Sequence, residues 1–418
     1  MNAVFAKGLA RVTESPLGPY QSAVIRIGFS ATWLLFLLRE IPHRTELYGP
    51  DGPWSWQLGR RLIDVNGAFT VLMWSDSRVW FEAVYFLAVL SAALLLVGWR
   101  ARTMSVVFMV GVLSLQNRSV FMGDGGDNVL HLMSVYLVFT RCARVWSLDA
   151  RRERRTADAR ARGEHVPDRV GPALWAVLGG TLAVATAAGW LTEGEWFVPA
   201  LLWAVWAAQG VWWLAARRAG ELRALCDITA NVLHNAALVV VMAEACLIYA
   251  TAGWYKIQGT RWQDGTAVYY PLQLDSFSPW PALADLLAAS GTLVMIATYG
   301  TVIAQVAFPF TLFNRRVKNV LLAVMMLEHA TIAVVLGLPF FSLAMIATDA
   351  VFLPTSFLLW LGAKTARARV LMSKEGPGGP GGTGRAGGAE GEGAGGGEGT
   401  GAAGTVEGTG KPHVGSTA

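Results

Sequence analysis

The chain has 418 residues, of which 54% are hydrophobic and only 15% are charged, and its mean hydropathy is +0.42. Soluble globular domains carry about 25% charged residues, so this composition is typical of an integral membrane protein and excludes an ordinary soluble enzyme. The net charge of +5 comes from basic residues in separate loops, which argues against a nucleic-acid partner. Residues 1–19 contain no apolar run of signal-peptide length. We therefore expect a cytoplasmic N-terminus and insertion into the cell membrane through the first apolar segment.

Ten apolar runs follow that are long enough, or nearly so, to cross the ~30 Å hydrocarbon core of a lipid bilayer. They are residues 22–38, 80–98, 104–115, 129–142, 172–190, 197–216, 232–254, 292–313, 320–337 and 341–361. The third and fourth runs are short, so one of them could be tilted or re-entrant. Helices satisfy all backbone hydrogen bonds within lipid, and the runs lack the alternation of barrel strands. The sequence therefore predicts an all-α, polytopic bundle of about ten transmembrane helices.

The loops between these runs alternate in charge. The basic loops contain Arg100 and Arg102; Arg141, Arg144, Arg151, Arg152, Arg154, Arg155, Arg160 and Arg162; Arg217, Arg218 and Arg223; and Arg315, Arg316 and Lys318. The intervening loops contain Asp124 and Asp127; Glu193 and Glu195; and Asp264, Asp275 and Asp285. An excess of Lys and Arg marks cytoplasmic loops. We expect both termini in the cytoplasm, which places Lys256 at the outer face.

This alternation also outlines the organisation of the chain. A membrane domain is expected over residues 20–372, with an Arg-rich cytoplasmic loop at 143–170. Residues 373–418 form a Gly-rich segment with almost no apolar surface to bury, so folding would not offset its conformational entropy. We expect this segment to be a disordered cytoplasmic tail.

Six ionisable side chains fall within the predicted helices: His131, His234, Glu244, Glu328, His329 and Asp349. Each charged group at mid-membrane costs about 2.5–3.5 kcal/mol on insertion scales, so these side chains should face one another or a hydrated cavity. For His329, the simpler alternative to a catalytic role is a buried histidine that hydrogen bonds to a neighbouring helix.

The loop FMGDGGDN precedes the fourth apolar run. Asp124 and Asp127 could bind a cation, but two carboxylates around two glycines also form an ordinary turn and helix cap. Octahedral and calcium-type sites need more oxygen ligands. We therefore expect no metal ion, with Asp127 or Asn128 as the N-cap of the next helix. Asn128 and His131 are three residues apart and should share a helix face.

The HExxH, GxSxG, Walker and GxGxxG patterns of common enzyme chemistry do not occur in a credible context. The three cysteines, Cys142, Cys226 and Cys246, lie in or beside apolar segments without paired spacing. They are expected to be small core residues rather than zinc ligands or a disulfide framework.

The seventh apolar run ends in AGWYKIQGTRWQDG, which contains Lys256. A lysine at this position could be an anchor whose long stem lets the ammonium reach water. It could also be a base, because burial in a medium of low dielectric constant favours the neutral amine. The residues alone leave both alternatives open.

Three stretches together resemble the horizontally transferred transmembrane (HTTM) family, which is related to the membrane domain of vitamin K-dependent gamma-carboxylases. LIYATAGWYKIQGTRWQDGTAVYY resembles the family pattern of tyrosine, Ala-Gly, lysine and Trp-x-x-Gly. GDNVLHLMSVYLVFTRCARVWSLDA resembles a helix that ends in a Trp-Ser-x-Asp turn, and 329–352 resembles a histidine-bearing helix pair. Arg26 stands where family members have an arginine in the first helix. The similarity covers about 20–361, interrupted by the Arg-rich loop.

In gamma-carboxylases the lysine that matches Lys256 is the base that deprotonates reduced vitamin K. The resemblance therefore implies a quinol-dependent, carboxylase- or epoxidase-like enzyme that uses reduced vitamin K or menaquinol and acts on a secreted peptide at the outer face. The catalytic set would be Lys256, His131, His329 and Asn128. The carboxylases have an Asn-His pair near the start of the fourth helix, which here meets Asp127-Asn128. Trp254, Tyr255 and Trp262 would provide flat apolar surface for the quinone.

The second hypothesis is a non-enzymatic multi-pass membrane protein that serves peptide or toxin maturation, export or transport. In that case the buried polar residues fix helix packing, and Glu244 and Asp349 would matter more than Lys256. Gamma-carboxylases continue into a large extramembrane domain that binds the substrate protein, whereas this chain continues into the Gly-rich segment. The resemblance therefore leaves the substrate undefined.

Overall fold

The computed structural model describes residues 2–164, 166–191, 196–218 and 220–374. Every regular element in these ranges is a helix, which confirms the predicted all-α class. The described residues up to Thr365 form one compact unit. The predicted disordered tail, 373–418, lies almost entirely outside the described residues.

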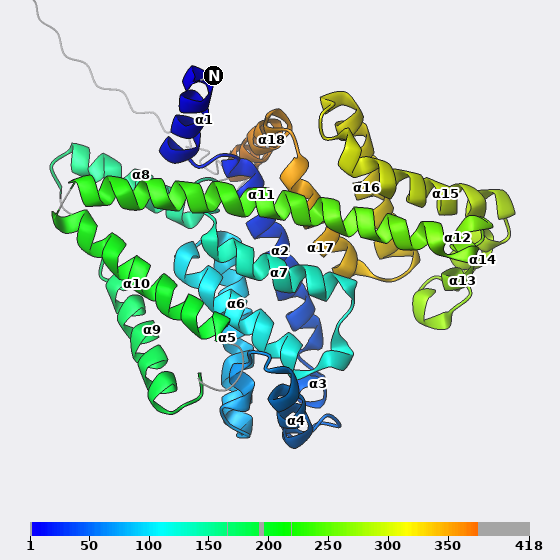
Figure 1. Cartoon of the computed structure of the whole chain (residues 1–418), viewed down its shortest axis with the longest axis horizontal. Helices are drawn as coiled ribbons and strands as arrows, with labels where there is room; N and C mark the ends of the chain where they lie inside the picture. Colours follow the sequence, from blue (N-terminus) through cyan, green and yellow to red (C-terminus); the bar gives the residue numbers. More distant parts are fainter. Residues whose placement is uncertain (1, 165, 192–195, 219, 375–418) are drawn as a thin grey trace, which may run out of the picture. The chain divides into compact units, whose positions relative to one another are not determined.

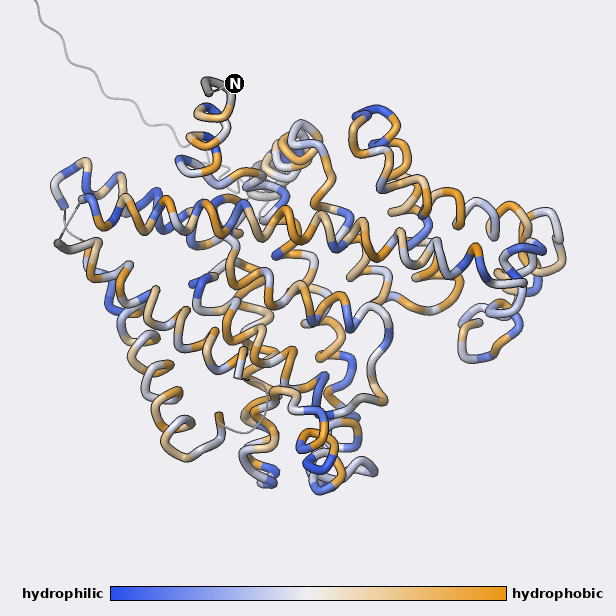
Figure 2. Tube along the Cα trace, viewed as in Figure 1, coloured by the Kyte–Doolittle hydropathy of each residue, from blue (hydrophilic) through white to orange (hydrophobic). Residues whose placement is uncertain are grey.

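Seven of the described helices are long and apolar enough to cross a membrane. They are α2 (Pro19–Glu40), α5 (Arg78–Val97), α9 (Val170–Ala187), α10 (Phe197–Arg218), α11 (Gly220–Gln258), α15 (Gly291–Ala307) together with the 3-10 turn that continues it to Thr311, and α16 (Arg315–Val335). Apolar side chains on their outer surfaces, such as Val239, Ile296 and Leu327, are exposed, and Figure 2 shows hydrophobic residues along most of their length. These features indicate a multi-pass membrane protein.

The third and fourth apolar runs form α6 (Ala101–Arg118) and α7 (Gly125–Phe139), which do not meet the same criteria for a span. At 1.5 Å per residue, the 15 residues of α7 cover about 22 Å, which is less than the hydrocarbon thickness. Both helices bury much of their surface: α6 packs against α5 and α7, and α7 also packs against α11, α2 and α17 (Pro339–Asp349). They are therefore interior helices of the bundle, and the predicted count of ten spans stays a prediction.

The tenth run, 341–361, was predicted as one helix, and this prediction was wrong. The chain forms α17, the 3-10 turn η5 (Ala350–Phe352) and α18 (Thr355–Lys374), with a bend of 115° between the two halves. Pro354 explains the break, because proline has no N–H to donate and forces the preceding Leu353 into an extended conformation. The pair would count as an eighth span only if it crosses the membrane as one bent segment.

The remaining helices are short or lie in loops. They are α1 (Asn2–Glu14), α3 (Arg44–Tyr48), α4 (Trp56–Asn66), α8 (Leu148–Ala161), α12 (Thr260–Gln263), α13 (Tyr269–Leu272) and α14 (Pro281–Ala288). The segment predicted as an Arg-rich loop thus contains α8, capped by the Ser147 hydroxyl, which accepts from the Ala150 N–H. In Figure 1, the 39-residue α11 crosses α2 instead of running beside it.

Arg26 joins α2 to the ends of its neighbours. Its guanidinium is fully buried (0% exposed) and donates to four backbone carbonyls: those of Leu95 (2.5 Å), Leu96 (2.6 Å), Cys142 (3.2 Å) and Trp146 (2.8 Å). The last carbonyls of a helix have no partner within the helix, so Arg26 satisfies the C-terminal end of α5. The geometry requires an arginine, because only its planar fork presents enough donors.

The two basic loops around Arg100 and Arg141 lie at the same end of the bundle. Asp149 accepts hydrogen bonds from the backbone N–H groups of Arg100 (3.0 Å) and Ala101 (2.8 Å), and Arg102 and Arg141 both approach the ring of Trp212. Alternating loop charge predicts this arrangement for these two loops. The position of the termini relative to the membrane stays a prediction.

Candidate functional site

Lys256 heads a row of three polar side chains on three helices. Its Nζ donates to Oε1 of Gln305 on α15 (2.8 Å), and Nε2 of Gln305 donates to Oε1 of Glu328 on α16 (2.8 Å). The amide of Gln305 therefore separates the ammonium from the carboxylate while bonding to both. Lys256 is half-buried, whereas Gln305 is buried. This arrangement compensates the charge of Lys256 without a direct ion pair.

A second group of buried polar side chains lies two turns away along α11. Tyr249 and Lys256 are seven residues apart, so they lie on the same helix face. The Tyr249 hydroxyl donates to Oδ1 of Asp349 at 2.7 Å and lies 3.1 Å from Nε2 of His329. Because the single hydroxyl proton goes to Asp349, the Tyr249 oxygen must accept from Nε2–H of His329. Nδ1 of His329 and Oδ2 of Asp349 are buried and have no partner within the described residues.

The three aromatic residues predicted to contact a quinone do not all lie beside Lys256. The ring centroid of Trp262 lies 5.2 Å from Nζ of Lys256, which is within the range of a cation–π contact. Trp254 and Tyr255 are 61% and 73% exposed, so they face away from the polar row. Of the three, only Trp262 contacts Lys256.

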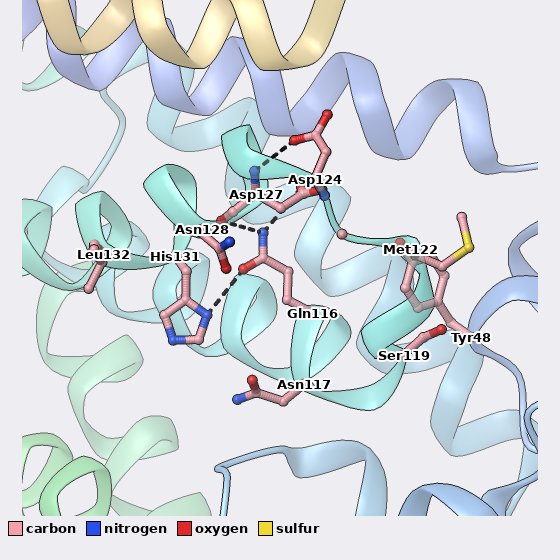
Figure 3. Close-up of a pocket in the computed structure, with 11 residues that line it drawn as sticks. Tyr48, Gln116, Asn117, Ser119, Met122, Asp124, Asp127, Asn128, His131 and Leu132 are labelled. Atoms are coloured by element: carbon pink, nitrogen blue, oxygen red, sulfur yellow. Dashed lines mark hydrogen bonds between the residues drawn. The ribbon is translucent and has the colours of Figure 1, made fainter. Parts of the chain in front are cut away.

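His131 and Asn128 lie in a different place. They line a cavity of about 470 Å³ (Figure 3) together with Tyr48, Gln116, Asn117, Ser119, Met122, Gly123, Asp124, Asp127 and Leu132. Nδ1 of His131 lies 3.2 Å from Oε1 of Gln116. Lys256 and His329 do not line this cavity. The predicted catalytic set is therefore divided between two locations, and the part played by each residue stays a prediction.

The loop before α7 shows one error in the prediction. The N-cap is Asp124, not Asp127 or Asn128: its carboxylate accepts from the N–H groups of Gly126 (2.6 Å) and Asp127 (3.1 Å). Asp127 stands at the third helical position and accepts from the Asp124 N–H at 2.9 Å, which completes a capping box. Desolvation raises the pKa of Asp127, which precedes the apolar run, to about 6, although the Asp124 N–H opposes this shift.

His234 has structural surroundings. Nδ1 of His234 accepts from the Arg141 N–H (2.9 Å), and its Nε2 lies 2.8 Å from the Leu17 carbonyl oxygen. With both ring nitrogens bonded to backbone, His234 fastens the segment before α2 to α11. All three cysteines are free thiols. Within the described part of the chain, no three His, Cys, Asp or Glu side chains are grouped closely enough to hold a metal ion.

Sequence reasoning missed several residues of both locations. Gln305 could have been found, because an amide within an apolar helix needs a partner in lipid. Tyr249 appeared only as one position of the family pattern, and a tyrosine in an apolar run is usually a packing residue. Tyr48 gave no signal, because it lies in a mixed-polarity loop far in sequence from the rest of the cavity.

Comparison of the chain with models of protein families, with curated proteins and with solved structures gives no match. The HTTM resemblance therefore stays a prediction that rests on the quoted motifs.

Proposed function

We propose that this protein is a multi-pass protein of the cell membrane that carries out base-initiated chemistry on a reduced quinone, with Lys256 as the base. The observation that supports this most is the hydrogen-bonded row of Lys256, Gln305 and Glu328. A general base needs a lone pair at a fixed position in a place where the charged form is disfavoured. The row provides the fixed position, and the partial burial of Lys256 provides the second condition.

Each residue of the row has a distinct task in this proposal. The Gln305 oxygen holds the Lys256 amine in one orientation, so Gln305 is a positioning residue. Glu328 follows Gln305 in the hydrogen-bonded row, and its carboxylate balances the positive charge that the amine gains on accepting a proton. The indole ring of Trp262 lies within cation–π range of Nζ and stabilises the same charge.

The surroundings of Lys256 fit a hydrophobic aromatic diol, such as reduced vitamin K or menaquinol. Lys256 is half-buried near the end of the apolar helix α11, and the ring of Trp262 gives it an apolar neighbour, while the exposed Trp254 and Tyr255 face away from the row. The unpartnered Nδ1 of His329 leaves hydrogen-bonding capacity deeper in the bundle. Once deprotonated, a reduced quinone supplies, with oxygen, the strong base needed to remove a proton from carbon. A secreted peptide is the proposed substrate.

The test is epoxide formation by the purified full chain supplied with reduced naphthoquinone and oxygen. Lys256→Ala should abolish the epoxide and leave the melting temperature nearly unchanged. Arg261→Ala is the matched control, because it removes a neighbouring exposed cation that contacts Tyr270 and Asp264 but not the row. If wild-type protein forms no epoxide with either reduced vitamin K or menaquinol, the proposed chemistry is wrong.

One observation favours the alternative, a non-enzymatic role in peptide maturation, export or transport. Tyr249 bonds to both His329 and Asp349 and thereby connects α11, α16 and α17, as a purely structural polar group would do. Substrate-dependent flux in liposomes that needs Glu244 and Asp349, but not Lys256, would support this alternative.

A further inference from the structure

The cavity of about 470 Å³ is separate from the Lys256 row and has no assigned occupant. Its walls come from the end of α3, the C-terminal end of α6 and the first turns of α7 (Figure 3). Its volume is within the range of about 300–1,000 Å³ that is typical of small-molecule sites. The lining contains both polar and apolar groups, so it is not one continuous apolar surface.

Two residues with little exposed surface present hydroxyl groups to one part of this cavity. Tyr48 is 3% exposed and Ser119 is 4% exposed, and within the described residues neither side chain makes a hydrogen bond. Their hydroxyl oxygens are not among the fully buried atoms without a partner, so both are open to the cavity. A molecule in the cavity can therefore hydrogen bond to Tyr48 and Ser119.

The charged groups of the lining all have the same sign. Asp124 and Asp127 contribute two carboxylates, and the lining contains no lysine or arginine. Arg39 is the guanidinium that influences Asp127, but it is paired with Glu40 and is not part of the lining. Amide groups and the His131 ring complete the polar surface. This lining attracts a cation and repels an anion.

We propose that the cavity binds a small organic molecule whose primary ammonium group contacts Asp124 and Asp127 and whose hydroxyl groups reach Tyr48 and Ser119. An ammonium carries three donors and forms charge-assisted hydrogen bonds with carboxylates, which accept only. With a pKa of about 6, Asp127 is ionised at neutral pH and can act as such a partner. This site is independent of the proposed quinone chemistry, because Lys256 does not line it.

Three sugars of similar size separate the effect of charge from that of shape. Glucosamine carries an ammonium group, glucose is neutral and glucuronate carries a carboxylate. Isothermal titration of the purified full chain at neutral pH should rank their affinities as glucosamine first, glucose second and glucuronate last. Equal affinity for glucosamine and glucose, tighter binding of glucuronate, or no binding of glucosamine at about 10 mM would overturn the proposal.

Two variants assign the contacts. Asn caps helices as well as Asp, so Asp124→Asn should fold normally and lower the affinity for glucosamine roughly tenfold, with little effect on glucose. Tyr48→Phe removes a hydroxyl without a partner in the protein, so it should weaken both sugars several-fold without loss of thermal stability. If Asp124→Asn unfolds, Asp127→Asn is the substitute, and unchanged glucosamine affinity in a folded variant contradicts the assignment.

Lys256→Ala distinguishes this proposal from the quinone proposal. Sugar binding should be unchanged in this variant, because the lining of the cavity is intact. Loss of epoxide formation together with normal glucosamine binding is the expected pair of results. A missing epoxide activity in the wild type would leave the binding experiment fully informative.

Discussion

The hydroxyl group of Tyr249 on α11 donates a 2.7 Å hydrogen bond to Asp349 at the end of α17. The two residues are 100 positions apart in the sequence. Both are buried, and the same hydroxyl oxygen also lies 3.1 Å from His329 on α16. One phenol therefore links three helices in the apolar interior of the bundle.

Replacing Tyr249 by phenylalanine should destabilise the fold by about 1–3 kcal/mol, because Asp349 and His329 would each lose a buried partner. The measurement is thermal unfolding of the purified protein in detergent. Tyr255→Phe is the matched control, since Tyr255 is largely exposed on the same helix and its loss should have no effect. Equal melting temperatures for the two variants would show that the link carries no stability.

Gln305 should control the reactivity of Lys256 if the proposed chemistry is correct. Gln305→Glu places a carboxylate beside Nζ, which stabilises the ammonium form and should move the pH profile of epoxide formation toward higher pH. Gln305→Leu removes the group that orients the amine and should lower the rate at every pH. A profile that is the same in all three proteins would show that Gln305 does not position the base.

The ion pair between Asp168 and Arg100 should make stability depend on pH in acid. Arg100 donates to both carboxylate oxygens at 2.5 Å, and these hydrogen bonds lower the pKa of Asp168 to about 2. A lowered pKa in the folded state adds stability above the ordinary value of about 4, and this stability is lost as the pH falls toward 2. Wild type and Asp168→Asn should differ in melting temperature at pH ~6 and converge as the pH falls to about 2.

The size of that difference should be modest and should fall with salt, because the Asp168 side chain is partly exposed. A difference that grew on acidification would contradict the sign of the shift.

Gly28 should tolerate no larger side chain. A Cβ atom at this position on α2 would lie 2.5 Å from Cβ of Ala347 on α17, closer than packed carbon atoms approach. Gly28→Ala should therefore cost about 1–3 kcal/mol, because two rigid helices would have to separate. Gly180→Ala on α9 is the control, since a Cβ there meets nothing within 4 Å and alanine favours the helix by up to about 1 kcal/mol. Unfolding measurements on both variants test the contrast.

Apolar runs predicted the positions of the helices well, because each long run has one continuous apolar surface that must be either buried in the protein or exposed to lipid. Their ends were predicted less well. The run 232–254 lies within α11, which extends from Gly220 to Gln258, because polar residues before the run continue the helix. The cap of α7 was placed too late, since glycine disfavours helix interiors and Gly125 and Gly126 nevertheless belong to the first turn.

The candidate sites show a similar division. Lys256, His329 and His131 could be selected from the sequence because ionisable groups in apolar runs are costly. The sequence could not predict which residues contact them. Helix packing brings Tyr249, Gln305 and Tyr48 to these side chains, and a single sequence contains no information on contacts between residues so far apart in the chain.

The four carbonyl partners of Arg26 also have a consequence for biosynthesis. All of them belong to residues 95–146, which are synthesised after α2. Until these residues have been made, the guanidinium lacks the four acceptors that it has in the folded chain. Full pairing of Arg26 therefore requires the loop that contains Trp146, so the final packing of the first apolar helix depends on residues more than 100 positions further along the chain.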